Sequence, residues 1–168
     1  MTIGRRIAVC PGTYDPVTYG HLDVIERASR LFDHVVVSVA EGSKKKQPLF
    51  TAEERKALLR QSVGHLENVE VVGFNCLLAD HAREVGATAF VKGVRTAADF
   101  EYENQMTQFN RRLAEGIDTV LLPASPEWGF LSSSGVREAA AWGASVDGWV
   151  PPHVAEALRD RLGTGRTA

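Results

Sequence analysis

The chain has 168 residues, a length that predicts a single domain able to bury a core of its own. Hydrophobic residues make up 44% of the chain and charged residues 24%, a balance that argues against disorder. The formal net charge of -2 does not support bulk binding of nucleic acid, and two cysteines do not make a disulfide framework.

The N-terminal residues carry two arginines and then an apolar run that is too short for a signal peptide or a membrane span. The sequence therefore predicts a cytoplasmic protein that has neither nucleic acid nor a membrane as a partner. We expect one domain over residues 1–168, with a flexible tail at residues 163–168.

Short apolar runs alternate with helical patterns along almost the whole chain. Most runs lack polar alternation, which is typical of strands buried on both faces of a parallel sheet. The predicted strands are residues 6–10, 34–40, 69–74, 89–91 and 119–122. The predicted helices are residues 20–32, 52–63, 77–85, 98–113, 133–142 and 152–162. This order indicates an α/β fold, a Rossmann-like doubly wound domain with a five-stranded parallel sheet and C-terminal helices.

Three local signals mark helix ends. Thr51 and Glu54 have the spacing of a capping box, Gly86 is a plausible helix stop, and Pro152 suits a first helical turn. In open α/β sheets, ligands bind beyond the carboxyl ends of the strands. The chemistry is therefore expected in residues 11–21, 41–50, 75–78, 92–99 and 123–134.

The first of these segments runs from a strand into a helix whose first turn contains His21. Free backbone N–H groups and the positive end of a helix make such a turn a phosphate site. The alternative is a plain turn, in which Thr18 caps the helix and His21 only decorates its surface. Thr13 and Thr18, together with His21 and two glycines in one turn, favour a site that acts on phosphate chemically.

Cations follow the second and fourth strands. Three lysines at 44–46 are either a solvated surface run or a source of one ammonium group for the ligand. Lys92 and Arg95 directly follow a strand and favour an anionic ligand, although Arg95 could instead pair with Asp99 or Glu101.

The helix that follows predicts both core and candidate site residues. Phe100, Met106 and Phe109 are expected in the core. Glu103 faces another direction, from which it could reach a ligand.

A second candidate cradle lies before the fifth helix. The serines at 132–134 are either helix caps or hydroxyl and N–H donors for a phosphate. Arg137 either adds charge there or pairs with Glu138. Trp128 or Phe130 could wall off an adenine ring or pack in the core.

Several chemistries find no support in the sequence. It lacks the P-loop, the G-x-G-x-x-G fingerprint, the G-x-S-x-G elbow and any Cys/His spacing for a protein-held metal. One histidine, several cations and two hydroxyl-rich helix starts fit phosphoryl or nucleotidyl transfer, in which catalysis is mainly positioning and charge stabilisation.

These segments resemble a known family. Thr18-Tyr19-Gly20-His21 is similar to the (H/T)xGH signature of the nucleotidyltransferase α/β-phosphodiesterase superfamily, and Ser132-Ser133-Ser134 to its second signature. Within the superfamily, residues 11–16, 92–95, 99–103 and 128–134 resemble, in order, segments of the bacterial phosphopantetheine adenylyltransferases. The similarity runs from Ile7 to Leu162 and is specific in combination.

The resemblance implies the reaction. Such enzymes transfer the AMP moiety of ATP to 4'-phosphopantetheine by direct in-line attack, giving dephospho-CoA and pyrophosphate in coenzyme A biosynthesis. It also implies Mg²⁺ held mainly by ATP phosphates and not by protein side chains, dephospho-CoA or CoA as product or inhibitor, and a homohexamer.

The resemblance also implies site residues. The implied phosphopantetheine contacts are Thr13, Lys46, Leu78 and Lys92. The implied ATP contacts are Thr13, Tyr14, His21, Gly93, Val94, Arg95, Glu103, Trp128, Gly129, Phe130, Leu131, Ser132, Ser133 and Ser134. The implied catalytic residues are His21, Lys46, Thr13 and Arg95. Lys46 is chosen among the three lysines because it keeps the family's four-residue distance to Phe50.

The chain departs mildly from the commoner family pattern. Tyr14 replaces the usual phenylalanine, Tyr19 an asparagine, Val94 a leucine and Lys92 an arginine, and Gly129 is unusual in its loop. Two alternatives remain. One is a nucleotidyltransferase of the same superfamily that acts on nicotinamide mononucleotide or glycerol phosphate, which the implied acceptor contacts disfavour. The other is a non-catalytic nucleotide-binding or regulatory module, which the intact motifs disfavour.

Overall fold

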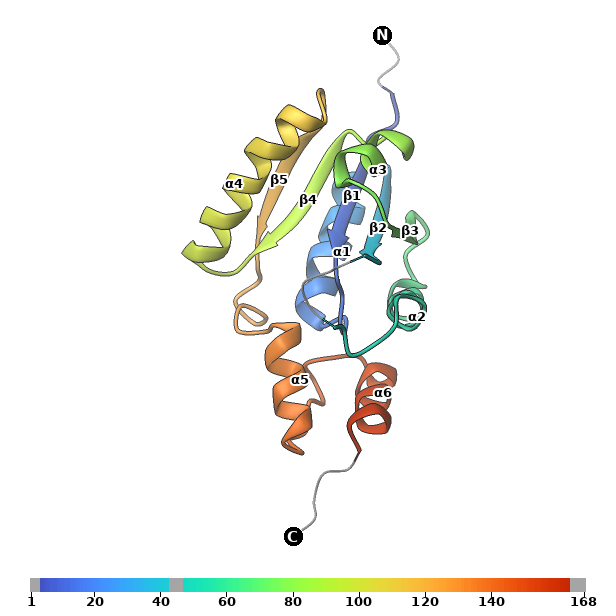
Figure 1. Ribbon diagram of the computed structural model, residues 1–168, viewed down its shortest axis with the longest axis vertical. Helices are drawn as coiled ribbons and strands as arrows, with labels where there is room; N and C mark the ends of the chain where they lie inside the picture. Colours follow the sequence, from blue (N-terminus) through green and yellow to red (C-terminus); the bar gives the residue numbers. More distant parts are fainter. Residues whose placement is uncertain (1–3, 43–46, 164–168) are drawn as a thin grey trace.

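A computed structural model of the chain describes residues 4–42 and 47–163. In this part of the chain, five parallel strands form one sheet in the order β3-β2-β1-β4-β5 (Figure 1). The strands are β1 (Ile7–Gly12), β2 (His34–Ala40), β3 (Val69–Phe74), β4 (Ala89–Val94) and β5 (Asp118–Pro123). The helices are α1 (Tyr19–Leu31), α2 (Ala52–Val63), α3 (Leu78–Glu84), α4 (Ala97–Leu113), α5 (Ser133–Ala141) and α6 (Pro152–Leu162).

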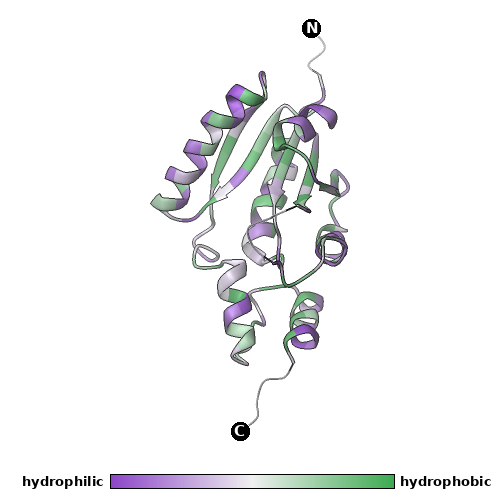
Figure 2. Ribbon diagram, viewed as in Figure 1, coloured by the Kyte–Doolittle hydropathy of each residue, from purple (hydrophilic) through white to green (hydrophobic). Residues whose placement is uncertain are grey.

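Helices cover both faces of the sheet, so the predicted doubly wound Rossmann-like fold is confirmed. Successive residues of β1 point to opposite faces: Ala8 and Cys10 join the core under α1 and α2, and Val9 joins the core under α3. Because both faces are buried, the strands are mainly hydrophobic, with the polar exceptions toward their ends, such as Lys92 in β4 (Figure 2). Helices α5 and α6 pack on each other beyond the carboxyl ends of the strands (Figure 1).

Three strands, β1, β4 and β5, are longer than the sequence predicts, and the extensions of β1 and β4 reach the expected site. Pro11 and Gly12 pair with β2, and Lys92 and Gly93 pair with β5, so these residues are strand residues and not loop residues. Parallel pairing continues past the end of each apolar run because backbone hydrogen bonding does not depend on side-chain polarity. The two glycines therefore stand at the sheet edge, where the chemistry was expected.

The helix-end signals are confirmed. Thr51 and Glu54 form the capping box, Gly86 adopts a positive φ of 66° after α3, and Pro152 opens α6. All six helices begin and end within one residue of the predicted bounds.

The core prediction for α4 is wrong. Phe100 is 50% exposed and Phe109 is 62% exposed, and Met106 is only partly buried. This helix packs against β4 and β5 at the edge of the sheet, so a large part of its circumference has no protein over it. Phe100 and Phe109 are therefore surface residues of α4 and not core residues.

None of the helices within residues 4–42 and 47–163 has the length and apolar character needed to cross a membrane. The predicted flexible tail lies almost wholly outside the described residues, since 164–168 are not among them.

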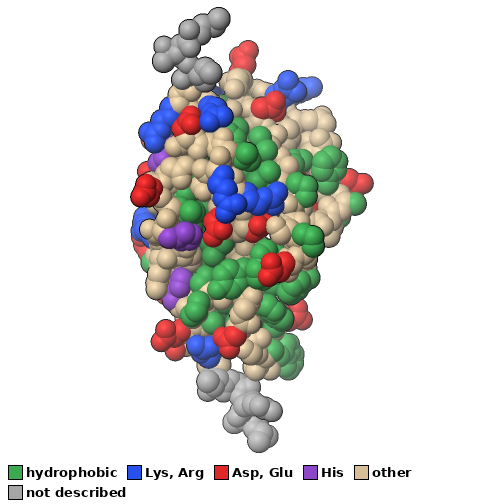
Figure 3. All heavy atoms as spheres, turned by 180° about the vertical axis from the view of Figure 1, so that it is seen from behind, with side chains coloured by type: hydrophobic (Ala, Val, Ile, Leu, Met, Phe, Trp, Pro, Cys, Tyr) green, Lys and Arg blue, Asp and Glu red, His purple; other side chains and the backbone are tan. Residues whose placement is uncertain are grey.

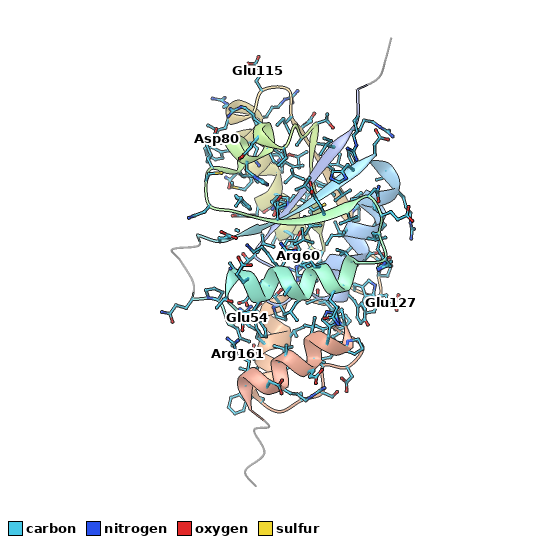
Figure 4. The ribbon with its side chains drawn as sticks, turned by 90° about the vertical axis from the view of Figure 1, so that its right-hand side faces the viewer. Glu54, Arg60, Asp80, Glu115, Glu127 and Arg161 are labelled. Carbon is cyan, nitrogen blue, oxygen red and sulfur yellow. The ribbon has the colours of Figure 1, made fainter. Side chains whose placement is uncertain are left out.

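The capping box of α2 yields a stability prediction. The Thr51 hydroxyl accepts from the Glu54 N–H at 3.3 Å, and the Glu54 carboxylate (labelled in Figure 4) accepts from the Thr51 N–H at 2.7 Å. Replacing Thr51→Ala should lower the free energy of unfolding by about 1 kcal/mol, measured by urea denaturation. Thr51→Ser keeps the hydroxyl and should recover most of the loss; an equal loss in both variants would contradict the cap.

Candidate active site

A cleft of about 270 Å³ opens at the carboxyl ends of β1 and β4. Its walls come from β1, α1, β4, α4 and the segment that leads into α5. The expected site residues that line it are Tyr14, His21, Lys92, Gly93, Arg95, Glu103, Trp128, Leu131, Ser132 and Ser133. Motifs far apart in the sequence thus meet at one place.

The other expected residues lie elsewhere. Thr13 and Ser134 line a neighbouring cavity of about 240 Å³, which Ser133 shares with the cleft. Val94, Gly129, Phe130 and Leu78 line neither cavity; Leu78 packs against the core under α3. Lys46 lies outside the described residues.

His21 is held as a neutral hydrogen-bond donor. The Thr18 N–H donates to Nδ1 at 3.0 Å, so Nδ1 is an acceptor and the ring proton resides on Nε2. Burial, with a smaller contribution from the positive charge of Arg95, lowers the pKa of His21 to about 4. Thr18 also caps α1 by accepting from the His21 N–H. Thr18 is therefore the helix cap that the plain interpretation expects, but His21 lines the cleft and does not merely decorate the helix surface.

Tyr14 supports His21 from the side. Its ring lies edge-on to the imidazole, with centroids 5.1 Å apart, and its hydroxyl donates to the Cys10 carbonyl at 2.9 Å. Tyr14 has φ of 52°, an unusual value for a residue with a side chain. A Cβ on Gly12 would lie 2.8 Å from the Tyr14 ring, so this turn requires glycine at position 12. Burial raises the pKa of Tyr14 well above its usual value, so the hydroxyl stays a neutral donor.

The two cations of the cleft have carboxylate partners. Lys92 Nζ lies 3.3 Å from Glu103 Oε1, and Arg95 Nε lies 3.0 Å from Asp99 Oδ2. Of the two partners considered for Arg95, the structure selects Asp99, and Arg95 still lines the cleft. An anionic ligand would therefore meet cations already fixed in direction by carboxylates.

The serine segment joins the two halves of the site. Ser132 caps α5 by accepting from the Gly135 N–H at 3.0 Å, and Ser133 donates to the Pro16 carbonyl at 2.8 Å. Arg137 pairs with Asp15, with Nη1 and Oδ2 3.4 Å apart, and the alternative partner Glu138 is not used. The capping interpretation is right for Ser132, and the segment also closes on the first loop.

Trp128 is the flat wall of the cleft. It stacks on Tyr19, with ring centroids 5.3 Å apart, and it lines the cleft. Phe130 is 64% exposed and stands edge-on to Trp149, outside the cleft. Of the two aromatic candidates, the structure therefore places only Trp128 where a ligand ring could stack.

Sequence reasoning missed several residues of these walls. Tyr102 and Cys10 line the cleft, and burial raises the pKa of the Cys10 thiol to about 12, which keeps it neutral. Arg55 and Asp15 are buried beside the second cavity. An arginine on a helix resembles an ordinary surface residue in sequence, so Arg55 left no signal.

Within the described residues, no group of three or more His, Cys, Asp and Glu side chains is arranged to hold a metal ion.

Comparison with known proteins relates this chain to nucleotidyl-transferring enzymes. Residues 9–139 match the model of the cytidylyltransferase-like family. A phosphopantetheine adenylyltransferase from Herpetosiphon aurantiacus is 51% identical over 158 residues, which cover 94% of this chain and 95% of that protein.

Two solved structures share the fold. One, described as a nicotinate-nucleotide adenylyltransferase from Vibrio parahaemolyticus, has a TM-score of 0.70 at 19% identity and covers 96% of this chain and 97% of its own. The other, a lipopolysaccharide core biosynthesis protein from Thermoplasma volcanium GSS1, has a TM-score of 0.54 at 23% identity and covers 73% of this chain and 98% of its own. At these identities the likeness concerns the fold alone.

The buried imidazole yields a titration prediction. The unfolded chain takes up the His21 proton near pH 6.5, and the folded protein does so only near pH 4. The free energy of unfolding should therefore fall as the pH is lowered through this window, and His21→Gln should remove this part of the slope. The NMR titration of the His21 ring should have its midpoint near 4, and a midpoint near 6.5 would contradict the assigned environment.

Proposed function

The chain belongs to the cytidylyltransferase-like family and, within it, to the phosphopantetheine adenylyltransferases, and we propose that it transfers the AMP moiety of ATP to 4'-phosphopantetheine. The products are dephospho-CoA and pyrophosphate, as in coenzyme A biosynthesis. The near full-length likeness to the Herpetosiphon enzyme is the observation that carries this proposal, because it covers 94% of this chain and not one motif.

The chemistry needs no general base. The acceptor phosphate is already anionic at pH 7; it attacks the α-phosphorus of ATP in line, and pyrophosphate leaves. Negative charge builds on the α-phosphoryl oxygens during this step. We assign its stabilisation to the Nε2–H of His21, which stays neutral at pH 7 and donates without being an acid. Lys46, which lies outside the described residues, is proposed to assist.

The remaining catalytic assignments follow the same geometry. Thr13 is proposed to orient the acceptor phosphate from the neighbouring cavity. Arg95, fixed by Asp99, is proposed to hold the leaving pyrophosphate together with Ser132 and Ser133. A phosphate that enters the cleft would contact Lys92 and Arg95 while each keeps its carboxylate partner. Arg95 would therefore bind it without a large change of conformation.

Some of the proposed binding residues line a cavity in the structure, and the others rest on the family resemblance alone. For ATP, the cleft supports Tyr14, His21, Gly93, Arg95, Glu103, Trp128, Leu131, Ser132 and Ser133, with Trp128 as the wall for adenine. For the acceptor, it supports Lys92. Thr13 and Ser134 are supported by the neighbouring cavity. Val94, Gly129, Phe130, Leu78 and Lys46 rest on the family resemblance alone.

The proposed metal is Mg²⁺. This ion prefers oxygen ligands and usually binds through substrate phosphates while keeping several waters. Asp99 and Glu103 supply carboxylate oxygens in the cleft wall, but each already contacts a cation. We therefore propose that the ion is held mainly by the phosphates of ATP, whose charge it would offset.

We further propose that residues 1–168 form one nucleotidyltransferase domain that works as a homohexamer in the cytoplasm. Exposed apolar side chains on α4, namely Phe100, Tyr102, Phe109 and Leu113, support an interface between copies. On the face turned away in Figure 1, hydrophobic side chains gather in patches around a central group of basic side chains (Figure 3). Dephospho-CoA and CoA are proposed as product and inhibitor.

The two alternative functions require different residues and predict different activities. A nucleotidyltransferase with another acceptor would keep His21 and the ATP wall but would not need Lys92 for phosphopantetheine. A regulatory module would bind ATP without turnover. Pyrophosphate release from ATP with 4'-phosphopantetheine, with nicotinamide mononucleotide, with glycerol phosphate and without acceptor separates the three.

The proposed role of His21 yields a catalytic prediction. Removing one preorganised donor costs roughly 10²–10³ in rate, so His21→Ala should lower kcat by about that factor while ATP binding stays measurable. Pyrophosphate release gives kcat, and calorimetry gives the ATP affinity.

His65→Ala is the matched control, because His65 lies on the surface beside Glu26. It should keep wild-type turnover. Near-wild-type pyrophosphate release by His21→Ala would remove His21 from the mechanism.

The exposed aromatic side chains of α4 yield an assembly prediction. Phe100→Ser and Phe109→Ser together should shift the particle from a hexamer to smaller species in light scattering, because they remove apolar area from the proposed interface. The free energy of unfolding of the smaller species should be little changed by losing exposed side chains. A wild-type protein that is already monomeric would contradict the hexamer.

A further inference from the structure

Arg55 of α2 is a buried charge whose hydrogen bonds converge on the first loop of the site. Its side chain is 2% exposed, although arginine is rarely buried to this extent. Nη1 donates to the carbonyl of Thr13 at 2.7 Å and to that of Ala40 at 3.0 Å, and Nε donates to the carbonyl of Phe50 at 3.1 Å. One guanidinium therefore fixes the loop after β1, the end of β2 and Phe50, which lies two residues before α2.

Arg55 contributes directed hydrogen bonds to the main chain and not an ion pair. Among the residues the structure describes, no carboxylate lies within ion-pair distance of it, and its partners are main-chain carbonyls. Burying a charge without a counter-ion is costly and is tolerated only where its hydrogen bonds are satisfied. Only a planar guanidinium offers donors in several fixed directions, whereas the ammonium of lysine is a point charge.

Asp15 joins the loop after β1 to the segment before α2 as a hydrogen-bond acceptor, whereas Arg55 joins them as a donor. Its carboxylate accepts from the N–H groups of Leu49 and Phe50 at 2.8 and 2.9 Å, and Arg137 lies 3.4 Å away. Phe50 thus donates its N–H to Asp15 and offers its carbonyl to Arg55. We name the pair Arg55 and Asp15, with their contacts to Phe50, the loop brace.

The loop brace lies directly beside groups that the reaction needs. Thr13, whose carbonyl Arg55 holds, lines the second cavity together with Arg55 itself. The next residue, Tyr14, packs edge-on to His21. A shift of the Thr13 peptide would therefore move the Thr13 hydroxyl and the support of His21 together.

We infer that Arg55 is a positioning residue for the transfer reaction: it fixes the main chain at Thr13, and so sets where the Thr13 side chain stands relative to His21. The inference rests on the proposed function, because it assigns Arg55 a role in that reaction. Arg55 touches main-chain carbonyls and acts through Thr13; it is not itself assigned a contact with substrate.

The test compares Arg55→Lys with Arg60→Lys on the same helix. Arg60 (labelled in Figure 4) also donates to a carbonyl, that of Val71 at 3.3 Å, but it lines neither the cleft nor the second cavity. Misplacement of a reacting group by about 1 Å can cost about 10²-fold in rate. Arg55→Lys should lower kcat by about 10- to 100-fold and leave KM for ATP within about threefold, because Trp128 and Leu131 are untouched. Arg60→Lys should keep both constants within about twofold.

A double-mutant cycle shows whether Arg55 acts through Thr13. In a Thr13→Ala background, Arg55→Lys should cause little further loss of kcat, because the group it positions is already missing. Losses that multiply in the double variant, or an unchanged kcat in Arg55→Lys, would overturn the inference.

Hydrogen exchange gives a readout that does not depend on turnover. The amide hydrogens of Leu49 and Phe50 should exchange faster in Arg55→Lys than in the wild-type protein. Their exchange rates should stay at the wild-type values in Arg60→Lys. If Arg55→Lys does not fold, Asp15→Asn takes its place in every assay. This substitution weakens the loop brace at its other member, Asp15. A wild-type protein without adenylyl transfer would overturn the proposed function; an active wild type with unchanged amides and kcat in the variants would overturn this inference alone.

Discussion

The loop between β1 and α1 is held in place by buried or partly buried polar groups that join it to two other parts of the chain. Arg55 donates to Thr13, Asp15 accepts from the main chain just before α2, and Ser133 donates to Pro16 from the start of α5. Each of these contacts replaces hydration that the buried group has lost, so each strongly favours one position of the loop. The position of His21 follows, because its ring is bonded to Thr18 at the end of the same loop.

The electrostatics of the cleft follow a related constraint. A site that must gather two polyanions needs positive charge, yet cations left without partners would repel one another and flex. Here Lys92 and Arg95 are each paired with a carboxylate on α4. Each carboxylate fixes the direction of its cation and also cancels part of the positive potential that the cation adds to the cleft. The imidazole adds no charge, since burial and Arg95 keep it neutral. Such a cleft is suited to preorganised hydrogen bonding more than to bulk attraction.

The edge position of α4 explains why this helix serves two purposes. Asp99 and Glu103 face the cleft, whereas Phe100 and Phe109, at other positions around the helix, are exposed. A sequence pattern shows that these phenylalanines share an apolar character, but it does not say whether the sheet or a second copy covers them. The core interpretation failed for this reason, and the exposure of these side chains is what supports the proposed role of α4 in assembly.

The sequence by itself determined the strands, the helices and the doubly wound class, because apolar runs, caps and glycine stops are local signals that each segment carries alone. It also determined most of the cleft, since His21, Lys92, Arg95 and the serine segment all lie at or after the carboxyl ends of strands. Only the tertiary structure decided which carboxylate holds Arg95, that Trp128 and not Phe130 faces the cleft, and that Arg55 is buried. These outcomes depend on contacts between segments far apart in the chain, and a side chain's identity does not specify which partner will lie beside it after folding.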